Sequence, residues 1–517
     1  RKYKMRVTNP IMEIDMPDID IIRVNDMYYM VSTTMFVTPG APVLRSRDLV
    51  HWEITSYIFN VIEDNPGYRL EEGKNAYGQG QWATSLKYYE GKFYACFACN
   101  DLQKTYIYST DDIEKTGWER ITLDGIYHDM SFVFEDGHVY LVYGNGEIRI
   151  VELESDLSGI KRGGVQRLLF STPKEGIGLR CEGCRWIAKD NFHYFFFIDW
   201  PTVGRKRRRV ICYRSAQLLG DYECKVLVDD DMGFFNNGIA QGTLIDTKEG
   251  EWYAMLFQDH GAVGRIPYLM PVTWEENWPV LAPGGKIPRS FETSFEEYKA
   301  EPLIISDSFS YEKDCLKPQW EWNHNPVPGG WSLTKRTGYL RLFSKVPAAN
   351  LMEARGTLTQ KTESPYSSFT IEIDASGMKP QEFAGLTAFQ GTYGSVGIRA
   401  QEKGAFAVEA VKGKLGQGET VEISVPIKSG QCFLRIDFDY CELKDRAAFY
   451  WSYDGENWET IGTQLQMKYT LDLFIGYRIG IFCYGNKTGG YADFRNFIFQ
   501  NKISGKGALS DSASGVK

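Results

Sequence analysis

Three acidic residues stand directly before strand-like segments. Asp18 precedes residues 21–24, Asp129 precedes residues 131–135 and Glu182 precedes residues 185–189. Clustered carboxylates repel one another, so a set that converges on one pocket indicates either a chemical role or a compensating cation. Two carboxyl groups across a sugar-sized pocket can hydrolyse a glycosidic bond, because one protonates the leaving oxygen while the other activates water. These residue types therefore predict hydrolytic chemistry, provided that the fold brings them together.

The local sequence around each acid predicts a different role. Glu182 lies between Cys181 and Gly183 before a very apolar segment, and a partly dry environment suits a general acid with a raised pKa. Asp18 lies in the polar turn Asp15–Asp20, which suits a base that stays ionised. A third carboxylate, Asp129, would raise the pKa of the acid by like-charge repulsion. We expect Asp15 and Asp20 to be turn and strand-edge neighbours.

A repeated unit supplies the fold that could bring these residues together. The unit is a short strand, a polar turn, an aromatic-rich strand and a third strand, and it occurs at residues 21–53, 85–119, 131–157, 185–223 and 243–281. Units of this kind at intervals of about fifty residues are typical of β-propeller blades. An open β-meander or a sandwich is the alternative. In a propeller the first strand of each blade lines the central channel, so Asp18, Trp82, Asp129, Glu182 and Gln241 would meet at one end of it.

The pattern changes after about residue 300. Alternating apolar and polar segments separated by turns continue to residue 500, which predicts a β-sandwich of jelly-roll type. The chain is thus predicted to be all-β, with a five-bladed β-propeller at residues 1–295, a β-sandwich at residues 300–500 and a flexible tail at residues 501–517.

Composition excludes several classes of function. The net charge of −9 argues against a nucleic-acid partner, and no apolar segment is long enough to cross a membrane. Aromatic residues make up 14% of the chain, which suits stacking on sugars. The two Cys-x-x-Cys pairs, Cys96/Cys99 and Cys181/Cys184, are interpreted as buried free thiols. The chain shows no signal peptide, which leaves cytoplasm and periplasm open, and the sequence does not indicate an oligomeric state.

Several segments carry a resemblance to family 43 of the glycoside hydrolases. The sequence resembles that family at residues 9–32 and 39–53, at 81–95, at 128–144, at 181–196 and at 261–281. Residues 309–326 and 338–344 are similar to the C-terminal sandwich of the xylosidase and arabinofuranosidase branch. The resemblance implies a five-bladed propeller that removes arabinose or xylose with inversion. It implies that Asp18 is the base, Asp129 the modulator of the acid's pKa and Glu182 the general acid.

The same resemblance implies further pocket residues. Arg265 matches the arginine that reaches the bound sugar, and Trp82 matches the pocket wall. We also expect Gln241, Phe36 and His260 to contact the substrate, although the usual aromatic pair of the first blade is replaced by Val37-Thr38. Family members often hold a calcium or sodium ion through a histidine where this chain has Gln241, so we expect no required cofactor and the resemblance does not support such an ion here.

The predicted function is an exo-acting, inverting α-L-arabinofuranosidase that acts on hemicellulose or its oligosaccharides. A β-1,4-xylosidase, or an enzyme with both activities, is the alternative. An endo-acting arabinanase is less favoured, because the sandwich would obstruct a long cleft. A non-catalytic carbohydrate-binding protein is the alternative from another class, and it predicts that removing Asp18 or Glu182 leaves hydrolysis unchanged.

Overall fold

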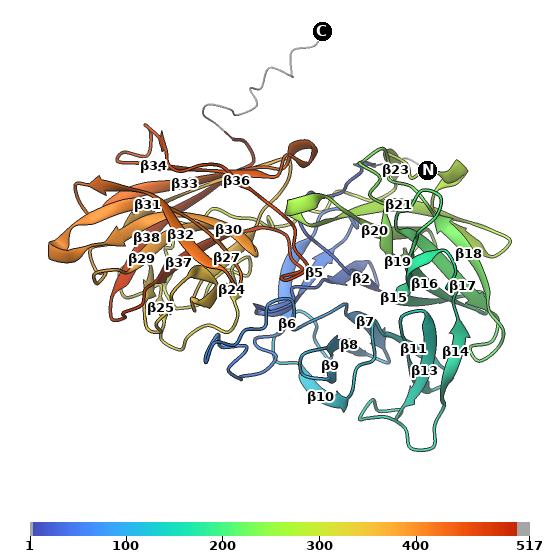
Figure 1. Cartoon of the computed structure of the whole chain (residues 1–517). Coiled ribbons are helices and arrows are strands. Elements are labelled where there is room, and N and C mark those ends of the chain that lie inside the picture. Colours follow the sequence, from blue (N-terminus) through green and yellow to red (C-terminus); the bar gives the residue numbers. More distant parts are fainter. Residues whose placement is uncertain (1–3, 504–517) are drawn as a thin grey trace, which may run out of the picture.

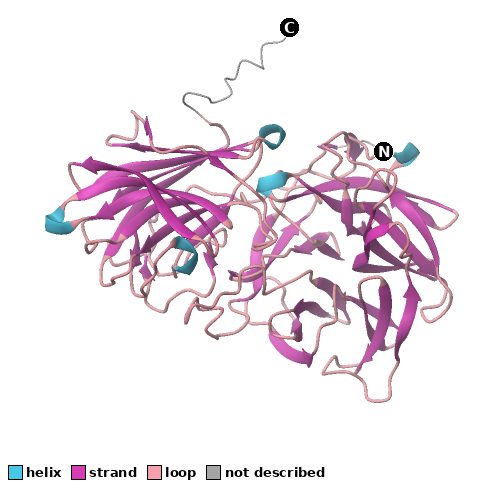
Figure 2. Ribbon diagram, viewed as in Figure 1, coloured by secondary structure: helices cyan, strands magenta, loops and turns pink. Residues whose placement is uncertain are grey.

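The computed structural model describes residues 4–503, so the predicted tail at residues 501–517 lies outside the described residues from residue 504 onward. Two β-domains lie side by side (Figure 1). Within residues 4–503, the regular structure is strand apart from short 3₁₀ turns (Figure 2). No helix in this part of the chain has the length and hydrophobicity needed to cross a bilayer.

The N-terminal domain is a five-bladed β-propeller, as predicted. Each blade is a four-stranded antiparallel sheet. The first and second blades are β2 (Asp20–Val24), β3 (Met27–Val31), β5 (Gly40–Ser46) and β6 (Glu53–Phe59), then β7 (Ser85–Tyr89), β8 (Lys92–Cys99), β9 (Lys104–Thr110) and β10 (Glu119–Asp124). The third and fourth are β11 (Ser131–Glu135), β12 (His138–Tyr143), β13 (Glu147–Leu153) and β14 (Gln166–Ser171), then β15 (Ile177–Lys189), β16 (Phe192–Pro201), β17 (Arg209–Ser215) and β18 (Glu223–Val228). The fifth is β19 (Ala240–Asp246), β20 (Trp252–Asp259), β21 (Arg265–Glu275) and β22 (Trp278–Val280).

The first strands of the blades form a closed ring. β2 contacts β7, β7 contacts β11, β11 contacts β15, β15 contacts β19 and β19 returns to β2. Outside the blades, β1 (Met5–Thr8) pairs with β23 (Ser290–Thr293) and joins the two ends of the domain. Ring closure means that the residues at one end of all five first strands face a common channel mouth.

Local sequence explains the hairpins that open the blades. The turns Glu90–Gly91, Asp136–Gly137 and Asp190–Asn191 each place two successive residues at positive φ. This backbone twist matches that of the flanking strands, and Asn, Asp and Gly adopt it at low cost. The polar turn residues of the repeats therefore fixed these hairpins, as predicted.

The C-terminal domain is a sandwich of two sheets. One sheet has the order β32-β31-β30-β29-β37-β27-β24-β4, and the other has the order β25-β26-β38-β28-β33-β34-β35, with β36 also pairing with β34. The first contains β4 (Val37–Thr38), β24 (Glu321–Asn323), β27 (Leu358–Lys361), β29 (Phe383–Phe389), β30 (Thr392–Ala400), β31 (Phe406–Lys414), β32 (Gly418–Ile427) and β37 (Arg478–Tyr484). The second contains β25 (Trp331–Ser332), β26 (Leu340–Phe343), β28 (Tyr366–Asp374), β33 (Gln431–Asp439), β34 (Arg446–Ser452), β35 (Glu459–Thr460), β36 (Leu465–Gln466) and β38 (Tyr491–Gln500).

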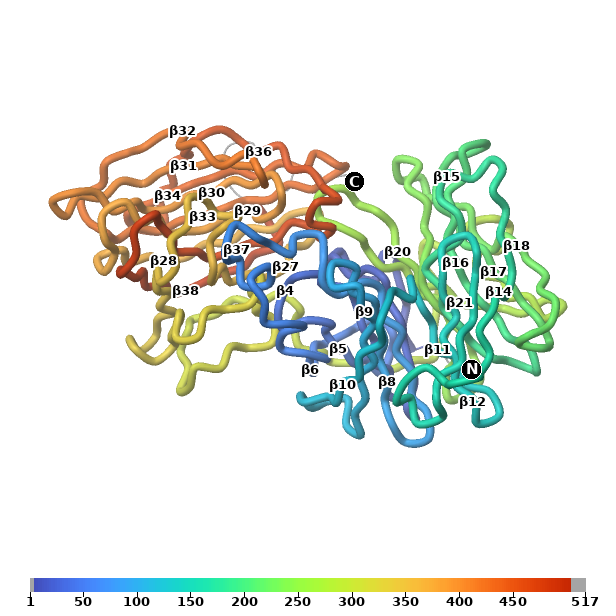
Figure 3. Tube along the Cα trace, turned by 60° about the horizontal axis from the view of Figure 1, so that its bottom comes forward, coloured from blue at the N-terminus to red at the C-terminus, as the bar shows by residue number. Residues whose placement is uncertain are grey.

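One strand of the sandwich comes from the propeller sequence. β4 leaves the first blade and pairs with β24 at the edge of the sandwich sheet. In Figure 3, β4 lies beside the sandwich strands, near β27. The Thr38 hydroxyl also donates a hydrogen bond to the His324 carbonyl oxygen at 2.7 Å. The sequence places residues 37–38 within the first propeller unit, and nothing in their pattern indicates that they complete a sheet of the other domain.

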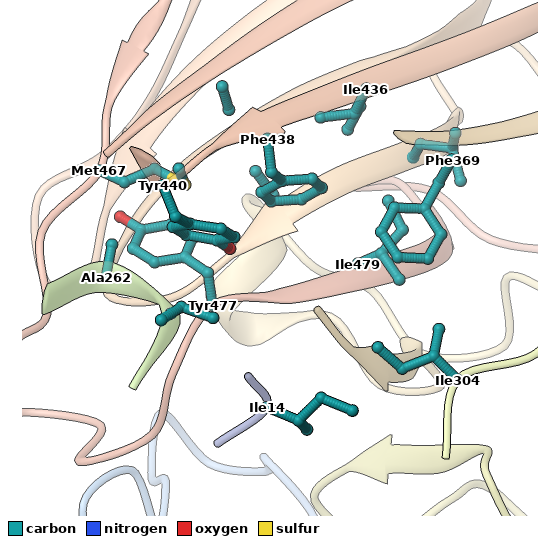
Figure 4. Close-up of a cluster of buried hydrophobic side chains, with 14 of the residues drawn as sticks. Ile14, Ala262, Ile304, Phe369, Ile436, Phe438, Tyr440, Met467, Tyr477 and Ile479 are labelled. Carbon is teal, nitrogen blue, oxygen red and sulfur yellow. The ribbon is translucent and has the colours of Figure 1, made fainter. Parts of the chain in front are cut away.

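The two domains share hydrophobic core. Ile14 and Ala262 of the propeller belong to the same buried cluster as Tyr440 and Tyr477 of the sandwich (Figure 4). A second cluster combines Phe36 and Tyr77 with sandwich residues such as Phe389 and Leu473. Because buried apolar area favours the docked arrangement, the sandwich is held in a fixed position beside the mouth of the channel.

Candidate active site

The three predicted acids gather at one end of the ring of first strands. Asp18 and Asp129 each lie two residues before a first strand, and Gln241 lies at the start of β19. Asp18, Asp129 and Gln241 each have a left-handed backbone conformation, with φ of 54°, 45° and 73° respectively. Non-glycine residues seldom adopt this conformation, and where they do, it clusters at functional sites. The repeated geometry gives these side chains equivalent positions at the channel mouth.

The Asp18 carboxylate is held through one of its oxygens. Arg265 Nη1 and Gln241 Nε2 each donate to Asp18 Oδ1 at 3.1 Å. Among the residues that the structure describes, no donor bonds to Oδ2. A carboxylate fixed in this way, with one oxygen left unbonded, can accept a proton from a water molecule.

Arg185 fixes the backbone that carries Asp18. Its guanidinium is completely buried and donates to the Asp18 carbonyl oxygen at 2.8 Å and to the Ile19 carbonyl oxygen at 3.2 Å. The buried Asp20 carboxylate lies 3.9 Å from the same guanidinium and accepts from the Leu86 amide at 2.7 Å. The first, second and fourth blades are thereby tied together beneath the site. Asp20 acts in this network and not only as a strand-edge neighbour.

Glu182 and Asp129 meet around His128. His128 Nε2 lies 2.9 Å from Glu182 Oε2 and 3.3 Å from Asp129 Oδ2. Glu182 Oε2 also accepts from Asn145 Nδ2 at 3.0 Å, and Asp129 Oδ2 accepts from the Gly183 amide at 2.9 Å. The side chain of Glu182 keeps 22% of its surface exposed, compared with 10% for Asp129. Glu182 is therefore the carboxyl group that a substrate can reach.

Gly183 makes this close arrangement possible. Its φ is +76°, and a Cβ at this position would lie 2.9 Å from the side-chain carbon of Gln241. Glycine adopts a positive φ without steric cost. The backbone after Glu182 can therefore turn toward Asp129 while Gln241 keeps its contact with Asp18.

Electrostatics distinguish the buried carboxyl from its neighbours. Burial raises the pKa of Asp129 to about 6; the charge of His128 opposes this increase, and those of Glu182 and Asp18 add to it. Burial lowers the pKa of His128, but the Asp129 charge and the hydrogen bond to Glu182 outweigh burial, and the pKa rises to about 9. His128 is thus a cation near neutral pH. The desolvated carboxyl group of the site is Asp129, whereas the sequence indicates a dry environment for Glu182.

His128, Asp129 and Glu182 also form the one group among the described residues whose ligand atoms could surround a metal ion. Their candidate ligand atoms lie within 4.8 Å of one another. A metal would need the neutral imidazole, whereas these contacts stabilise the protonated ring. The residues present therefore fit a hydrogen-bonded acid pair better than a metal site.

Arg265 connects Asp18 with an aromatic wall. Its guanidinium carbon lies 4.9 Å from the centre of the Phe474 ring and 5.2 Å from that of Phe257, and the Phe474 ring lies 5.5 Å from Trp82. Several buried polar atoms in this region make no hydrogen bond of normal geometry to the described residues, namely Arg265 Nε and Nη2, Trp82 Nε1 and the Tyr469 hydroxyl, although Tyr469 lies close enough to Arg265 to raise the pKa of the guanidinium. Buried polar groups in native proteins are normally paired, so these groups suit the hydroxyls of a bound sugar.

Phe474 and Tyr469 come from the sandwich, on the segment before β37. Asp15 fastens this segment to the propeller, because it accepts from the Arg265 amide at 2.7 Å and from the Gly476 amide at 3.0 Å. A Cβ on Gly476 would lie 2.0 Å from the Val263 carbonyl oxygen, so only glycine allows this close approach. Asp15 is therefore a connector between the domains, and the sandwich supplies one wall of the pocket.

The structure places two predicted substrate contacts elsewhere. Phe36 is completely buried, and its ring packs 5.0 Å from Tyr77 and 5.0 Å from His324, so it serves the domain interface. The His260 ring stacks on Phe234 at 4.2 Å and bonds Gln258 and Tyr268. It lines a cavity of about 340 Å³ between the propeller and the sandwich, whose lining includes Tyr268 and Tyr440 but neither Asp18 nor Glu182. Burial lowers the pKa of His260 to about 4, so the ring is neutral there.

Sequence reasoning missed several residues of the site. Asn145 follows β12 at the same end of the third blade, and its Gly-Asn-Gly turn is the signal that could have indicated it. Arg185 lies in a strand that also contains Arg180, Glu182 and Lys189, so its charge alone gives no signal of its buried position. Phe474 and Tyr469 have no local signal, because only the docking of the sandwich brings them to the channel mouth.

Replacing Asp129 by asparagine is expected to raise stability at neutral pH and to lower activity. The folded-state pKa of about 6 lies above the ordinary value of an aspartate, about 4, so the folded state favours the protonated form. The stability contributed by that protonation is fully present below about pH 4 and is lost as pH rises through about 6. At pH 7.5 asparagine removes the free-energy cost of keeping the buried carboxyl group ionised, on the order of 2–3 kcal/mol. The loss of the Asp129 charge should lower kcat by roughly 10²-fold.

Thermal unfolding of both proteins at pH 4 and pH 7.5, with kcat at pH 7.5, checks this prediction. The gain in melting temperature should be present at pH 7.5 and absent at pH 4. An asparagine variant that is less stable than wild type at both pH values would show that Asp129 is a structural anchor.

Replacing Phe474 by alanine is expected to raise KM by about tenfold with a smaller change in kcat. The ring contributes contacts with Arg265 and Trp82, and a cation–π contact of this kind is worth about 0.5–2 kcal/mol. Steady-state kinetics on an aryl pentoside give the result. Leu471→Ala on the same segment is the control, since this side chain is 69% exposed. Equal kinetics for Phe474→Ala and wild type would exclude the sandwich from the pocket.

Comparison with known proteins agrees with this geometry. Residues 7–279 match the model of "Glycosyl hydrolases family 43", and residues 306–500 match that of "Beta xylosidase C-terminal Concanavalin A-like domain". A curated relative from Formosa agariphila, named β-xylosidase, is 28% identical over 95% of this chain and 90% of its own. A non-reducing end α-L-arabinofuranosidase of Bacteroides ovatus is 27% identical over 65% of this chain and 64% of its own.

Solved structures agree as well. A chain from Bacteroides eggerthii described as "Bifunctional GH43-CE" is 39% identical, with a TM-score of 0.91 over 97% of this chain. The present chain spans 64% of the length of that protein. With a propeller that matches the family model across all five blades and a C-terminal sandwich of the kind matched above, the chain belongs to family 43 of the glycosyl hydrolases.

Proposed function

We propose that this glycoside hydrolase is an exo-acting, inverting enzyme that releases a terminal pentose from xylan- or arabinan-derived chains. One observation carries the proposal, namely three carboxyl groups in three different environments at one channel mouth. Asp18 is fixed through Oδ1, Asp129 is desolvated and Glu182 is the reachable group between His128 and Asn145. Environments that differ in this way allow two carboxyls to take the separate roles of acid and base.

In the proposed reaction, Glu182 donates its proton to the glycosidic oxygen as the bond to the anomeric carbon breaks. Asp18 Oδ2 accepts a proton from the attacking water, whose oxygen forms the new bond to that carbon from the opposite face. The leaving chain departs as a neutral alcohol. The pentose is released with inverted configuration at its anomeric carbon. Arg265 orients Asp18, and its unpaired nitrogens suit the sugar hydroxyls. After the products leave, Asp18 releases to solvent the proton that it took from water, and the partly exposed Glu182 regains one from solvent.

The position of the sandwich supports exo action. The segment that carries Phe474 packs against Arg265 and Trp82, and the Asp472 carbonyl lies so close to Gly78 that a Cβ there would be 2.5 Å away. This covers one side of the pocket, so a chain end fits more readily than the middle of a polymer.

We propose β-xylosyl as the first sugar and α-L-arabinofuranosyl as the second. The relative that aligns over 95% of this chain is named β-xylosidase, and the C-terminal match carries the same word. The sequence-based prediction placed arabinofuranosyl first, and the Bacteroides ovatus relative supports that sugar over a shorter alignment. Both sugars are pentoses with similar hydroxyls, so the buried polar groups around Arg265 suit either class.

Hydrolysis of two aryl glycosides tests the proposal. The kcat/KM on 4-nitrophenyl β-D-xylopyranoside should exceed that on 4-nitrophenyl α-L-arabinofuranoside by tenfold or more, which corresponds to about 1.4 kcal/mol of transition-state discrimination. The reverse order would return arabinofuranosyl to first place. Hydrolysis that persists unchanged in Asp18→Ala and Glu182→Ala would instead favour a carbohydrate-binding protein with a contaminating activity.

A further inference from the structure

A groove lies between the outer strands of the first and second blades. The strands β6, β9 and β10 lie near one another there (Figures 1 and 3), and the Ser56 hydroxyl of β6 donates to the Ile113 carbonyl oxygen of the β9–β10 connection at 2.6 Å. The groove has a volume of about 280 Å³, whereas one water molecule occupies about 30 Å³ in the liquid. Its lining includes neither Asp18 nor Glu182, so it is separate from the catalytic pocket.

Buried aromatic side chains form the floor of this groove. The Tyr108 ring stacks against Phe59 and Phe97, with ring centres 6.0 Å and 5.7 Å apart. Trp118, from the β9–β10 connection, lines the same groove. Only 4% of Tyr108 and 8% of Trp118 are exposed. Packing therefore fixes these rings in one orientation, and they offer a flat apolar surface with a polar atom at its edge.

Two polar atoms of the floor are left without a partner. Trp118 Nε1 and the Tyr108 hydroxyl make no hydrogen bond of normal geometry to the described residues. Burial raises the pKa of Tyr108 to about 12, and the nearby Arg120 opposes this increase. The neighbouring Tyr106 hydroxyl, by contrast, donates to Glu63 at 2.9 Å. Since buried polar groups are normally paired, the two floor atoms suit hydrogen bonds to a ligand.

The rim of the groove is polar, and its one charge is compensated. Asn60, Thr116 and Arg120 are exposed and line the groove. Arg120 is the one ionised side chain among the described residues of this lining, and its Nη2 lies 3.1 Å from Glu63 Oε1. Its Nη1 donates to the Ile62 carbonyl oxygen at 2.7 Å, which holds the guanidinium in place. An aromatic floor with a polar, compensated rim favours a neutral ligand over a charged one.

We propose that this groove is a second, non-catalytic carbohydrate site that holds a neutral pentosyl chain. The apolar face of a sugar packs on the aromatic floor, and its hydroxyls bond the Tyr108 hydroxyl, Trp118 Nε1 and the amide of Asn60. The groove itself indicates a neutral sugar, while the choice of pentose rests on the proposed function. Because the groove lies on the outer side of the blades, it can accept the middle of a chain, whereas the proposed pocket accepts an end. The site would keep the enzyme on its polysaccharide between turnovers.

Native electrophoresis in gels that contain soluble arabinoxylan tests this site. The Asp18→Asn protein serves as the background, so that no hydrolysis occurs, and a polymer presents few chain ends to the pocket. This protein should migrate more slowly than in a gel without polysaccharide. Adding Tyr108→Phe should raise the apparent dissociation constant about five- to tenfold, as expected for the loss of one hydrogen bond and its partner. Without sugar, the same change should not lower the melting temperature, because the protein itself does not pair this hydroxyl.

The control is Tyr88→Phe, since Tyr88 lies on the same blade, is 42% exposed and does not line the groove. Asn60→Ala, at the exposed rim, is a second variant that should weaken retardation without affecting the fold. Unchanged retardation in Tyr108→Phe and Asn60→Ala, or a lower melting temperature of Tyr108→Phe without sugar, would overturn the site. Retardation that only free xylose abolishes would place all binding in the catalytic pocket, which overturns the groove and leaves the proposed function intact. Hydrolysis of the two aryl glycosides tests that function separately.

Discussion

Replacing Asp18 by asparagine is expected to lower kcat by roughly 10³–10⁴-fold on every substrate, at the upper end of what a general base contributes. Asparagine keeps the size of the side chain and can still accept from Arg265 and Gln241, so the pocket should retain its shape. It cannot accept the proton of the attacking water. Steady-state kinetics on aryl and oligosaccharide substrates should show the same loss, because the base acts on water and not on the leaving group.

Asp26→Asn is a matched control on the same blade. Asp26 pairs with Arg47 at 2.9 Å, and both side chains are exposed, so this variant should keep wild-type kcat. A folded Asp18→Asn variant with more than a tenth of wild-type kcat would remove Asp18 from the role of base.

Replacing Glu182 by glutamine is expected to lower kcat/KM by about 10³-fold on oligosaccharides but by less than tenfold on a dinitrophenyl pentoside. A dinitrophenolate departs without protonation, so it does not need the acid. Glutamine can still accept through its carbonyl oxygen from Asn145, which should preserve the local hydrogen bonding.

The dependence on the leaving group is the decisive comparison for Glu182. An equal loss on both substrates would indicate that Glu182 holds the structure or binds the sugar. His128→Asn provides a second comparison, since it removes the cation that contacts both Glu182 and Asp129 and should shift the pH profile without abolishing activity.

The propeller could be predicted because its determinants are local. Hairpin turns such as Asp136–Gly137 adopt the positive φ values that their residue types favour, and aromatic-rich strands follow at a regular spacing. The edge of the sandwich could not be predicted in the same way. β4 contains only Val37 and Thr38, and its pairing with β24 depends on contacts between segments nearly three hundred residues apart.

The residues of the site also differ in whether local sequence could predict their positions. The sequence predicts that Asp18, Asp129 and Gln241 lie close together, because each stands at the same place in a repeat. The closed ring of first strands places them at one channel mouth. Phe36 and His260 are predicted from residue type near the expected pocket. The structure buries Phe36 at the domain interface and places His260 in a separate cavity between the propeller and the sandwich. Phe474 was not found, because its contact with Arg265 follows from how two domains pack.

The structure also differs from the sequence-based prediction in which carboxyl group is desolvated. The sequence around Glu182 is apolar, but Gly183 turns the backbone so that Asp129 receives the amide hydrogen bond and the burial. Glu182 remains partly exposed and bonds Asn145 and His128. A network of this kind depends on two blades at once, so the apolar character of one strand is a poor guide to it.

The stereochemistry of the first product tests the central claim most directly. Proton NMR during the first minutes of hydrolysis of a β-xyloside distinguishes the two anomers of the released sugar before they equilibrate. If Glu182 is the acid and Asp18 activates water on the opposite face, α-xylose is formed first and β-xylose follows by mutarotation. Initial release of β-xylose would mean that a covalent intermediate forms, and it would contradict the roles proposed here for both residues.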